Sequence, residues 1–168
     1  MTKRNTILFF LLLPVICISY MACTKDDSGR NPCLEPRRYF LNLRSFQAAD
    51  TGSEGVELKM PSPVVGYVDT PIWFGGSTIP GSSFSGPLSG IADSTRWFII
   101  PDTMNWAGRD TITFYYQRKP VFLSTSCGYA IVYSLQRLVT TNYLIDSARI
   151  EKSEVNGASD VIHVKVFY

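Results

Sequence analysis

The sequence is poor in the residues that most catalytic and metal sites use. It has a single histidine, His163, and four cysteines. A Ser-His-Asp or Cys-His set needs a histidine as its base, and a zinc site needs further ligands that this chain does not supply at suitable spacing. His163 lies near Lys165 in an alternating apolar stretch, so we expect an exposed strand residue. No metal and no other cofactor is predicted.

The sequence also lacks a phosphate-binding glycine loop and an evident pair of catalytic acids. Gly75-Gly76 has neither the Lys-Ser/Thr ending nor the following helix of such a loop. Glycoside hydrolysis needs two carboxyl groups that flank the scissile bond. The close acidic pairs fall in a polar segment, a loop and a strand end: Asp26/Asp27, Glu54/Glu57 and Glu151/Glu154. We therefore predict that the protein is not an enzyme.

No apolar run is long enough for a membrane-spanning helix. The longest, from Ile7 to Ile18, has 12 residues and contains Pro14, whereas a spanning helix needs about 20. The run follows Lys3 and Arg4 and precedes smaller residues, which is the order of a secretory signal peptide. Residues 1–22 are therefore predicted to be a signal peptide.

The segment Tyr20-Met21-Ala22-Cys23 resembles a bacterial lipobox, although Tyr20 replaces the usual Leu or Val. The resemblance implies that Cys23 is lipidated and begins the mature chain. Acyl chains contribute about 0.8 kcal/mol per buried CH₂, so two or three of them hold a protein firmly on a membrane. Residues 23–37 are then a polar, lipidated tether.

Lys25-Asp26-Asp27 follows the lipidation site. It looks like the export signal that sends lipoproteins of Bacteroidota to the outer face of the outer membrane. The alternative is that these charges only keep the tether solvated. We predict an outer-membrane lipoprotein, with the cell surface favoured over the periplasmic face.

The charge of the chain argues against nucleic acid as a partner. Sixteen basic residues face 14 acidic ones, for a net charge of +2. Lys3 and Arg4 of the predicted signal peptide account for that whole excess. Nucleic-acid binding needs a basic stripe, and the remaining neutral domain offers none in its composition.

Two cysteines, Cys33 and Cys127, remain once Cys17 is assigned to the signal peptide and Cys23 to the lipid. Such a pair is expected to oxidise outside the cytoplasm. The bridge would close a long loop and contribute up to roughly 4 to 5 kcal/mol in the chain-entropy model. Metal binding is the rival role, but neither cysteine has a CxxC neighbour.

The remainder of the chain, 38–168, has the pattern of a single all-β domain. Stretches rich in Val, Ile, Thr and aromatic residues alternate with Gly, Pro, Asn and Asp clusters. This pattern predicts a small antiparallel β-sandwich, immunoglobulin-like or similar, of about seven to eight strands. No helical period is convincing. The predicted strands are 38–46, 63–74 (one strand, or two separated at Pro71), 95–100, 109–117, 120–134, 143–152 and 160–168.

The sequence predicts the conformation of two connections between strands. Residues 75–90 contain five glycines and two prolines, so they should form a long loop or two turns around a short strand at Phe84. Asn156-Gly157 should make a tight turn between the last two strands. In the last strand one face should be core: Ile162, Val164, Val166 and Tyr168.

Aromatic doublets recur in the predicted strands. Neighbours on a strand point to opposite faces, so each doublet sends one ring to the core and one outward. The outward rings are either covered by loops or form an exposed patch that binds a glycan or a protein. The candidate binding surface consists of Trp73, Trp97, Trp106 and Tyr115. The doublets are Tyr39-Phe40, Trp73-Phe74, Trp97-Phe98, Tyr115-Tyr116 and Phe167-Tyr168.

Three segments, DSTRWFIIP, DTITFYYQRKPVFLSTSCGYAIVY and the ending HVKVFY, resemble a family of uncharacterised Bacteroidota lipoproteins with a domain of unknown function. The most distinctive elements are RKPVF at 118–122 and CGY at 127–129. The resemblance implies a small β domain with Cys33 paired to Cys127 and no catalytic residues to carry over. It also suggests an outer-membrane β-barrel protein as a partner.

These observations predict an outer-membrane-anchored lipoprotein that is a non-catalytic accessory or binding module for an envelope protein or glycan. One alternative is a structural lipoprotein that faces the periplasm. A second is a hydrolase whose carboxylates converge only in the fold.

Overall fold

The computed structural model describes residues 39–48, 55–70, 72–76, 79–105, 108–125, 127–157 and 161–168. All of them lie within one compact unit, Pro36–Tyr168. The described residues contain ten strands and no helix. Accordingly, within these ranges there is no helix that could cross a membrane.

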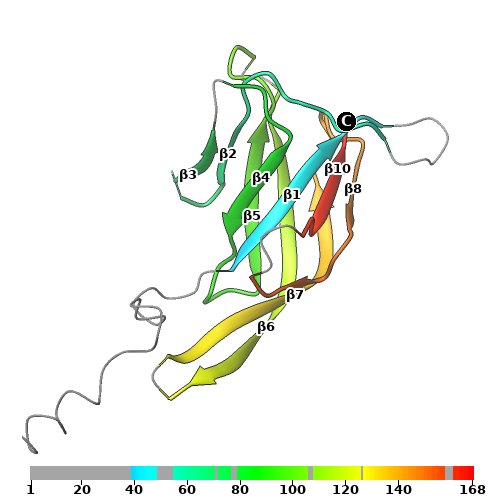
Figure 1. Ribbon diagram of the computed structural model, residues 1–168. Helices are drawn as coiled ribbons and strands as arrows, with labels where there is room; N and C mark the ends of the chain where they lie inside the picture. Colours follow the sequence, from blue (N-terminus) through cyan, green and yellow to red (C-terminus); the bar gives the residue numbers. More distant parts are fainter. Residues whose placement is uncertain are drawn as a thin grey trace, which may run out of the picture. The chain divides into compact units, whose positions relative to one another are not determined.

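The strands form two sheets (Figure 1). The smaller sheet has the order β4-β1-β10-β8 and the larger one β3-β2-β5-β6-β7-β9. The expected all-β sandwich is therefore confirmed, with ten strands instead of seven or eight. The strands are β1 Phe40–Phe46, β2 Val64–Tyr67, β3 Trp73–Gly76, β4 Ser83–Pro87, β5 Ser94–Ile100, β6 Asp110–Ser124, β7 Gly128–Thr140, β8 Ser147–Ile150, β9 Glu154–Val155 and β10 Val164–Phe167.

Nearly all neighbouring strands are antiparallel, and β1 with β10 is the parallel exception. This pair joins the first and last strands of the domain, with Leu43 opposite Val164 and Ser45 opposite Val166. All four residues are buried. The smaller sheet is therefore complete only when the C-terminal strand β10 has paired with β1.

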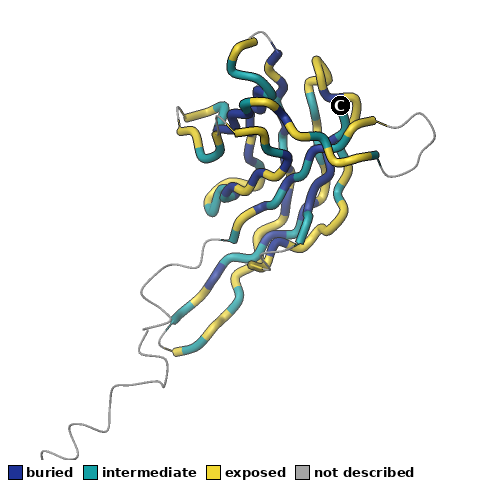
Figure 2. The backbone as a smooth tube through the Cα atoms, turned by 45° about the horizontal axis from the view of Figure 1, so that its top comes forward, coloured by how far each residue is buried: buried dark blue, intermediate teal, exposed yellow. Residues whose placement is uncertain are grey.

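The core fills the space between the two sheets, where the buried segments gather in Figure 2. Trp97 of β5 lies at its centre and is fully buried. The rings of Phe74 and Phe114 each lie 4.7 Å from it in edge-on contacts. Such aromatic pairs add about 0.5 to 1.5 kcal/mol each beyond the burial of their area.

The prediction of separate strands at 109–117 and 120–134 was wrong at its boundary. β6 continues through Pro120 to Ser124, and β7 begins at Gly128. The Ser124 hydroxyl accepts a hydrogen bond from the Cys127 amide, and Gly128 has a φ of 66°. Pro120 does not end the strand because it lies beyond the pairing with β5, on an open edge where no amide is needed.

The predicted strand 63–74 is divided into β2 and β3, with a turn that includes 68–70. Of the two expectations for 75–90, the short strand at Phe84 is confirmed: it is β4, with the Phe84 side chain buried, and the end of β3 also falls within this segment. Glycine was read as a strand breaker here, but Gly86 lies inside β4. The Phe74 ring occupies the space that a Cβ at Gly86 would need, so this glycine is required by packing.

β8 and β10, which fall in the last two predicted strands, pair as expected in an antiparallel arrangement. Their connection is longer than a tight turn, because it also contains β9, which pairs with β7. Gly157 has a φ of 95° and faces the Tyr39 ring. In the last strand Val164 and Val166 are core residues as predicted and Tyr168 packs against the core, but Ile162 is only half-buried. Lys165 on the other face is 8% exposed, because its ammonium lies over the Phe46 ring and 3.6 Å from the Glu151 carboxylate.

Candidate functional site

The outer face of the larger sheet carries the most distinctive group of exposed side chains. Because Trp97 points into the core, its neighbour Phe98 points to this outer face. The partner of Phe98 across β2 is Gly66, and the partner of Gly66 across β3 is Trp73. Partners across strands share a face, so Trp73 and Phe98 lie in one row with only a glycine between them.

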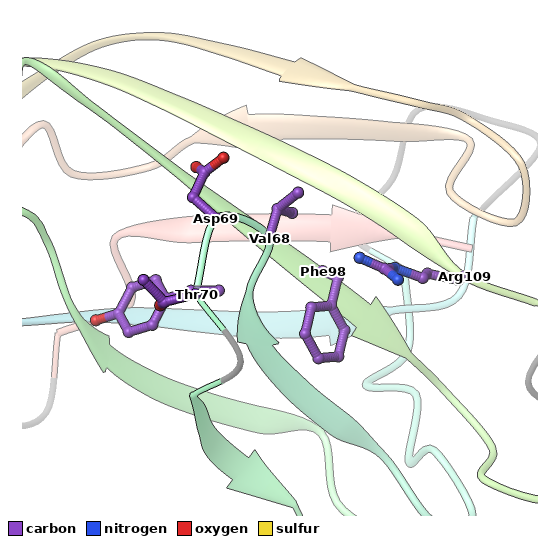
Figure 3. Close-up of a pocket in the computed structure, with 6 residues that line it drawn as sticks. Val68, Asp69, Thr70, Phe98 and Arg109 are labelled. Carbon is purple, nitrogen blue, oxygen red and sulfur yellow. The ribbon is translucent and has the colours of Figure 1, made fainter.

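A hollow of about 310 Å³ lies at one end of this face (Figure 3). Its floor is the Phe98 ring, which lies over β2 because Gly66 has no side chain: a Cβ there would lie 2.7 Å from the ring. The Arg109 guanidinium lies beside this ring, 4.6 Å from its centroid. The lining residues are Tyr67, Val68, Asp69, Thr70, Phe98 and Arg109.

The two charged residues of the hollow differ in their partners. Asp69 accepts two hydrogen bonds from Arg96, one of them from Nε at 3.2 Å, and this pairing raises the pKa of Arg96. Arg109 is exposed and has no acidic partner among the described residues. Its donors are therefore available to a ligand, while its flat face is held by Phe98.

A second arginine on this face repeats the arrangement. Arg137 lies over the Tyr115 ring at 4.4 Å, and the two residues are cross-strand partners in β6 and β7. Tyr115 is 36% exposed. The outer face thus combines flat aromatic surfaces with guanidinium groups.

Of the four residues predicted for a binding surface, Trp73 and Tyr115 are exposed on this face, with Trp73 at 59%. Trp97 was predicted wrongly: it is completely buried between Phe74 and Phe114. Trp106 lies outside the described residues, as do Cys23 and Cys33. The pairing of Cys33 with Cys127 and the lipidation of Cys23 therefore stay predictions.

Phe98 and Arg109 were missed by the sequence reading. The doublet rule assigned one ring of Trp97-Phe98 to each face, and the choice of Trp97 as the outward ring was the wrong one. Phe98 is itself only 6% exposed, because Val64, Val68 and Ile100 pack around it. No pattern in the sequence distinguishes Arg109 from other arginines.

A second exposed region is an arm formed by residues 117–134, where β6 and β7 continue past the neighbouring strands (Figure 1). Phe122 is 55% exposed and Tyr129 is 72% exposed, and their rings are 5.4 Å apart. The arm contains both the RKPVF and the CGY segments.

The expectation that His163 is exposed was wrong. It is completely buried, and its Nδ1 accepts a hydrogen bond from the Asn42 amide at 3.0 Å. Burial lowers the pKa of His163. The neutral imidazole thus fastens the start of β10 to β1, and it is not presented to solvent.

Asp110 is the most heavily bonded acid among the described residues. Its carboxylate accepts hydrogen bonds from the Thr141 hydroxyl at 2.6 Å and from the amides of Tyr143, Leu144 and Ile145 at 2.6 to 3.0 Å. Burial alone would raise the pKa of Asp110, but these four bonds outweigh it and the pKa is lowered. Its oxygens are occupied in holding the 141–145 loop.

Metal ligation finds no support in the described ranges. Those residues include no group of three or more His, Cys, Asp or Glu side chains arranged to hold an ion.

The fold and this open face define an all-β sandwich with a shallow surface site. The chain belongs to a family of unknown function, DUF6452, whose model matches residues 72–168. The match runs from just before β3 to the C-terminus and includes the arm. It confirms the resemblance to an uncharacterised family. No match was found among curated proteins or solved structures.

Proposed function

We propose that the protein is a lipid-anchored lipoprotein of the outer membrane that acts as a non-catalytic binding module. The observation that supports this function best is the hollow beside Phe98, where an unpaired arginine stacks on an aromatic floor at an open surface. An open aromatic face with a few placed donors suits the binding of a ligand.

The acids near this face give little support to the hydrolase alternative. Asp69 is the one carboxylate that lines the hollow, and it is paired with Arg96. A glycosidase needs two carboxyl groups on either side of the bond. Asp110 has its oxygens occupied by the loop that it holds.

The ligand class that fits is a glycan with an acidic group. The row from Trp73 across Gly66 to Phe98 spans two strand spacings, about 10 Å, and the Phe98 ring covers Gly66 within it. An exposed tryptophan offers a face on which a sugar ring can stack. Arg109 offers the planar fork of donors that binds a carboxylate in two places.

A glycan array tests the proposal, with uronic-acid oligosaccharides and neutral oligosaccharides of the same length as probes. We expect binding to the acidic probes. Arg109→Met should weaken it roughly tenfold or more, because a hydrogen bond to a charged group contributes about 1.5 to 3 kcal/mol. Arg137→Met is the matched control, since Arg137 also lies on an aromatic ring of this face but outside the hollow.

Equal binding of acidic and neutral probes, or equal losses in the two variants, would remove the role assigned to Arg109. Absence of binding to every probe would leave the envelope-protein form of the proposal, with the outer-membrane β-barrel protein as its candidate partner. That form is tested by isolating the tagged chain from mildly solubilised membranes and measuring the stoichiometry of any protein that copurifies.

A further inference from the structure

The two long edges of the arm are open in the part of the chain that the structure describes. β5 pairs with β6 only as far as Tyr115, and β9 pairs with β7 only at Tyr133 and Ser134. Among the described residues, 128–132 have backbone partners in β6 and in no other strand. An open strand edge is a template on which another strand can pair.

The direction of the backbone groups along β7 follows from its pairing with β9. The Leu135 amide donates to the Ser153 carbonyl at 2.8 Å, so the backbone groups of Leu135 point away from β6. In an antiparallel strand, alternate residues direct their amide and carbonyl groups to the same side. The register shows no shift between Tyr129 and Leu135, so Ile131 and Tyr129 also direct theirs to the open edge.

The two edges of the arm differ in their protection. On β6 the same alternation directs the backbone of Pro120 to the open edge, where it offers no amide donor. Arg118 and Lys119 add charge beside it. Proline and lysine are the usual means by which strand edges avoid pairing. On β7, in contrast, residues 127–136 include neither proline nor a charged side chain.

We propose that two copies of this chain associate through the open edge of β7, antiparallel and about a two-fold axis at Ala130. In that register Tyr129 of one copy lies opposite Ile131 of the other, and both residues already direct their backbone groups outward. Each such pair exchanges two hydrogen bonds, so the contact forms four. Tyrosine opposite isoleucine is a favourable cross-strand pair of aromatic and β-branched side chains.

The segment suits a second copy because it is complementary to itself. A two-fold contact requires the same residues on both sides, and here one short segment supplies the outward donors, the outward acceptors and both side chains of each cross-strand pair. The small Ala130 lies on the axis, where a large side chain would meet itself. With no charge on the segment, two copies brought edge to edge do not repel.

Cysteine cross-linking of the full-length chain tests this register. Ala130 would face Ala130 of the second copy as a non-hydrogen-bonded pair with Cα atoms about 4.5 Å apart, which lies in the range for a disulfide. Two Val132 residues would be offset by four residues, about 13 Å, which no disulfide spans. On oxidation of lysed cells, Ala130→Cys should shift to a band of twice the monomer mass, and Val132→Cys should not.

The chain without an added cysteine is the control, because it shows how much dimer band the native cysteines produce on oxidation. A further pair of variants separates backbone pairing from side-chain contact. Ile131→Pro in the Ala130→Cys chain removes an outward amide but none that bonds to β6, so the dimer band should be lost. Ile131→Ala keeps the amide, and the band should persist.

A monomeric Ala130→Cys chain would overturn the proposal, as would equal cross-linking of Ala130→Cys and Val132→Cys. Either result would point to another occupant of the edge, such as a strand of a different protein. The inference does not depend on glycan binding, because the arm and the hollow are separate, and the Arg109 variants leave this edge unchanged.

Discussion

At the scale of single residues, Asp110 shows how a buried acid can be structural. Its carboxylate receives four hydrogen bonds that together fix the 141–145 loop. Asp110→Asn replaces one acceptor oxygen with an NH₂ group that faces donors. We expect a loss of about 1 to 3 kcal/mol in the free energy of unfolding, the usual cost of leaving such buried groups unpaired. Asp146→Asn, at an exposed position, should have little effect.

The pH dependence of that loss follows from the lowered pKa. The unfolded chain takes up the proton near the ordinary value of 3.8, whereas the folded chain resists it. The stabilisation by the ionised Asp110 is therefore complete above about 3.8 and is lost as the pH falls through the lower folded pKa. Chemical denaturation of the original chain and Asp110→Asn should show a difference that narrows on acidification. A constant difference would contradict the assigned ionisation.

Only part of the candidate site can be predicted from the sequence. The aromatic doublets correctly placed Trp73 and Tyr115 in outward positions, because alternation is a local property of strands. Alternation does not say which member of a doublet faces the partner sheet, and a one-residue shift reverses the answer. Trp97 was misplaced for that reason. Arg109 could not be found, because its role depends on Phe98, which the fold brings beside it.

At the scale of elements, strand existence was predicted better than strand ends. Four of the ten strands lie entirely within a segment that the pattern assigned to a strand, namely β1, β2, β8 and β10. The arm was missed because proline was treated as a boundary, although an open edge tolerates it. The parallel pairing of β1 with β10 joins segments from opposite ends of the chain, which no local pattern encodes.

Glycines within strands give a prediction at this scale. A Cβ at Gly66 would lie 2.7 Å from the Phe98 ring and 2.9 Å from the Ile72 carbonyl oxygen. Gly66→Ala should therefore lower the free energy of unfolding by about 1 to 3 kcal/mol, the range for overpacking. Gly76→Ala in the adjacent β3 is the matched control, because its nearest neighbour would be 3.7 Å away. Thermal melting of both variants measures the difference, and equal melting temperatures would contradict the close approach.

At the scale of the whole molecule, the all-β class was predictable and the arrangement of the sheets was not. Composition and the spacing of turn residues define the class, because both act locally. The sheet order depends on contacts between distant segments. The hollow depends on β2, β5 and the start of β6 meeting on one face. The predicted signal peptide and lipidation site at the N-terminus concern the location of the protein and not its fold.

The predicted lipidation site, Cys23, can be tested by substitution. If Cys23 carries the acyl chains, Cys23→Ala should lose incorporation of labelled fatty acid and shift from the membrane to the soluble fraction, or persist as a membrane-bound precursor. Each buried CH₂ contributes about 0.8 kcal/mol, so loss of two or three chains removes the lipid anchor, and a precursor that stays on the membrane is held by its uncleaved apolar segment instead. Cys17→Ala is the matched control, because that cysteine lies in the predicted signal peptide and its loss should leave labelling unchanged.

Equal labelling of both variants would contradict the lipobox assignment.

Protease treatment of intact cells distinguishes the two faces of the outer membrane. A surface-exposed domain is cleaved, and a periplasmic one survives until the membrane is opened. Exposed arginine and lysine residues of the domain, such as Arg109 and Lys152, offer sites for trypsin. Substituting Lys25, Asp26 and Asp27 by uncharged residues should move the chain from the cleaved to the protected class if they direct it outward. Unchanged cleavage would mean that these charges only solvate the tether.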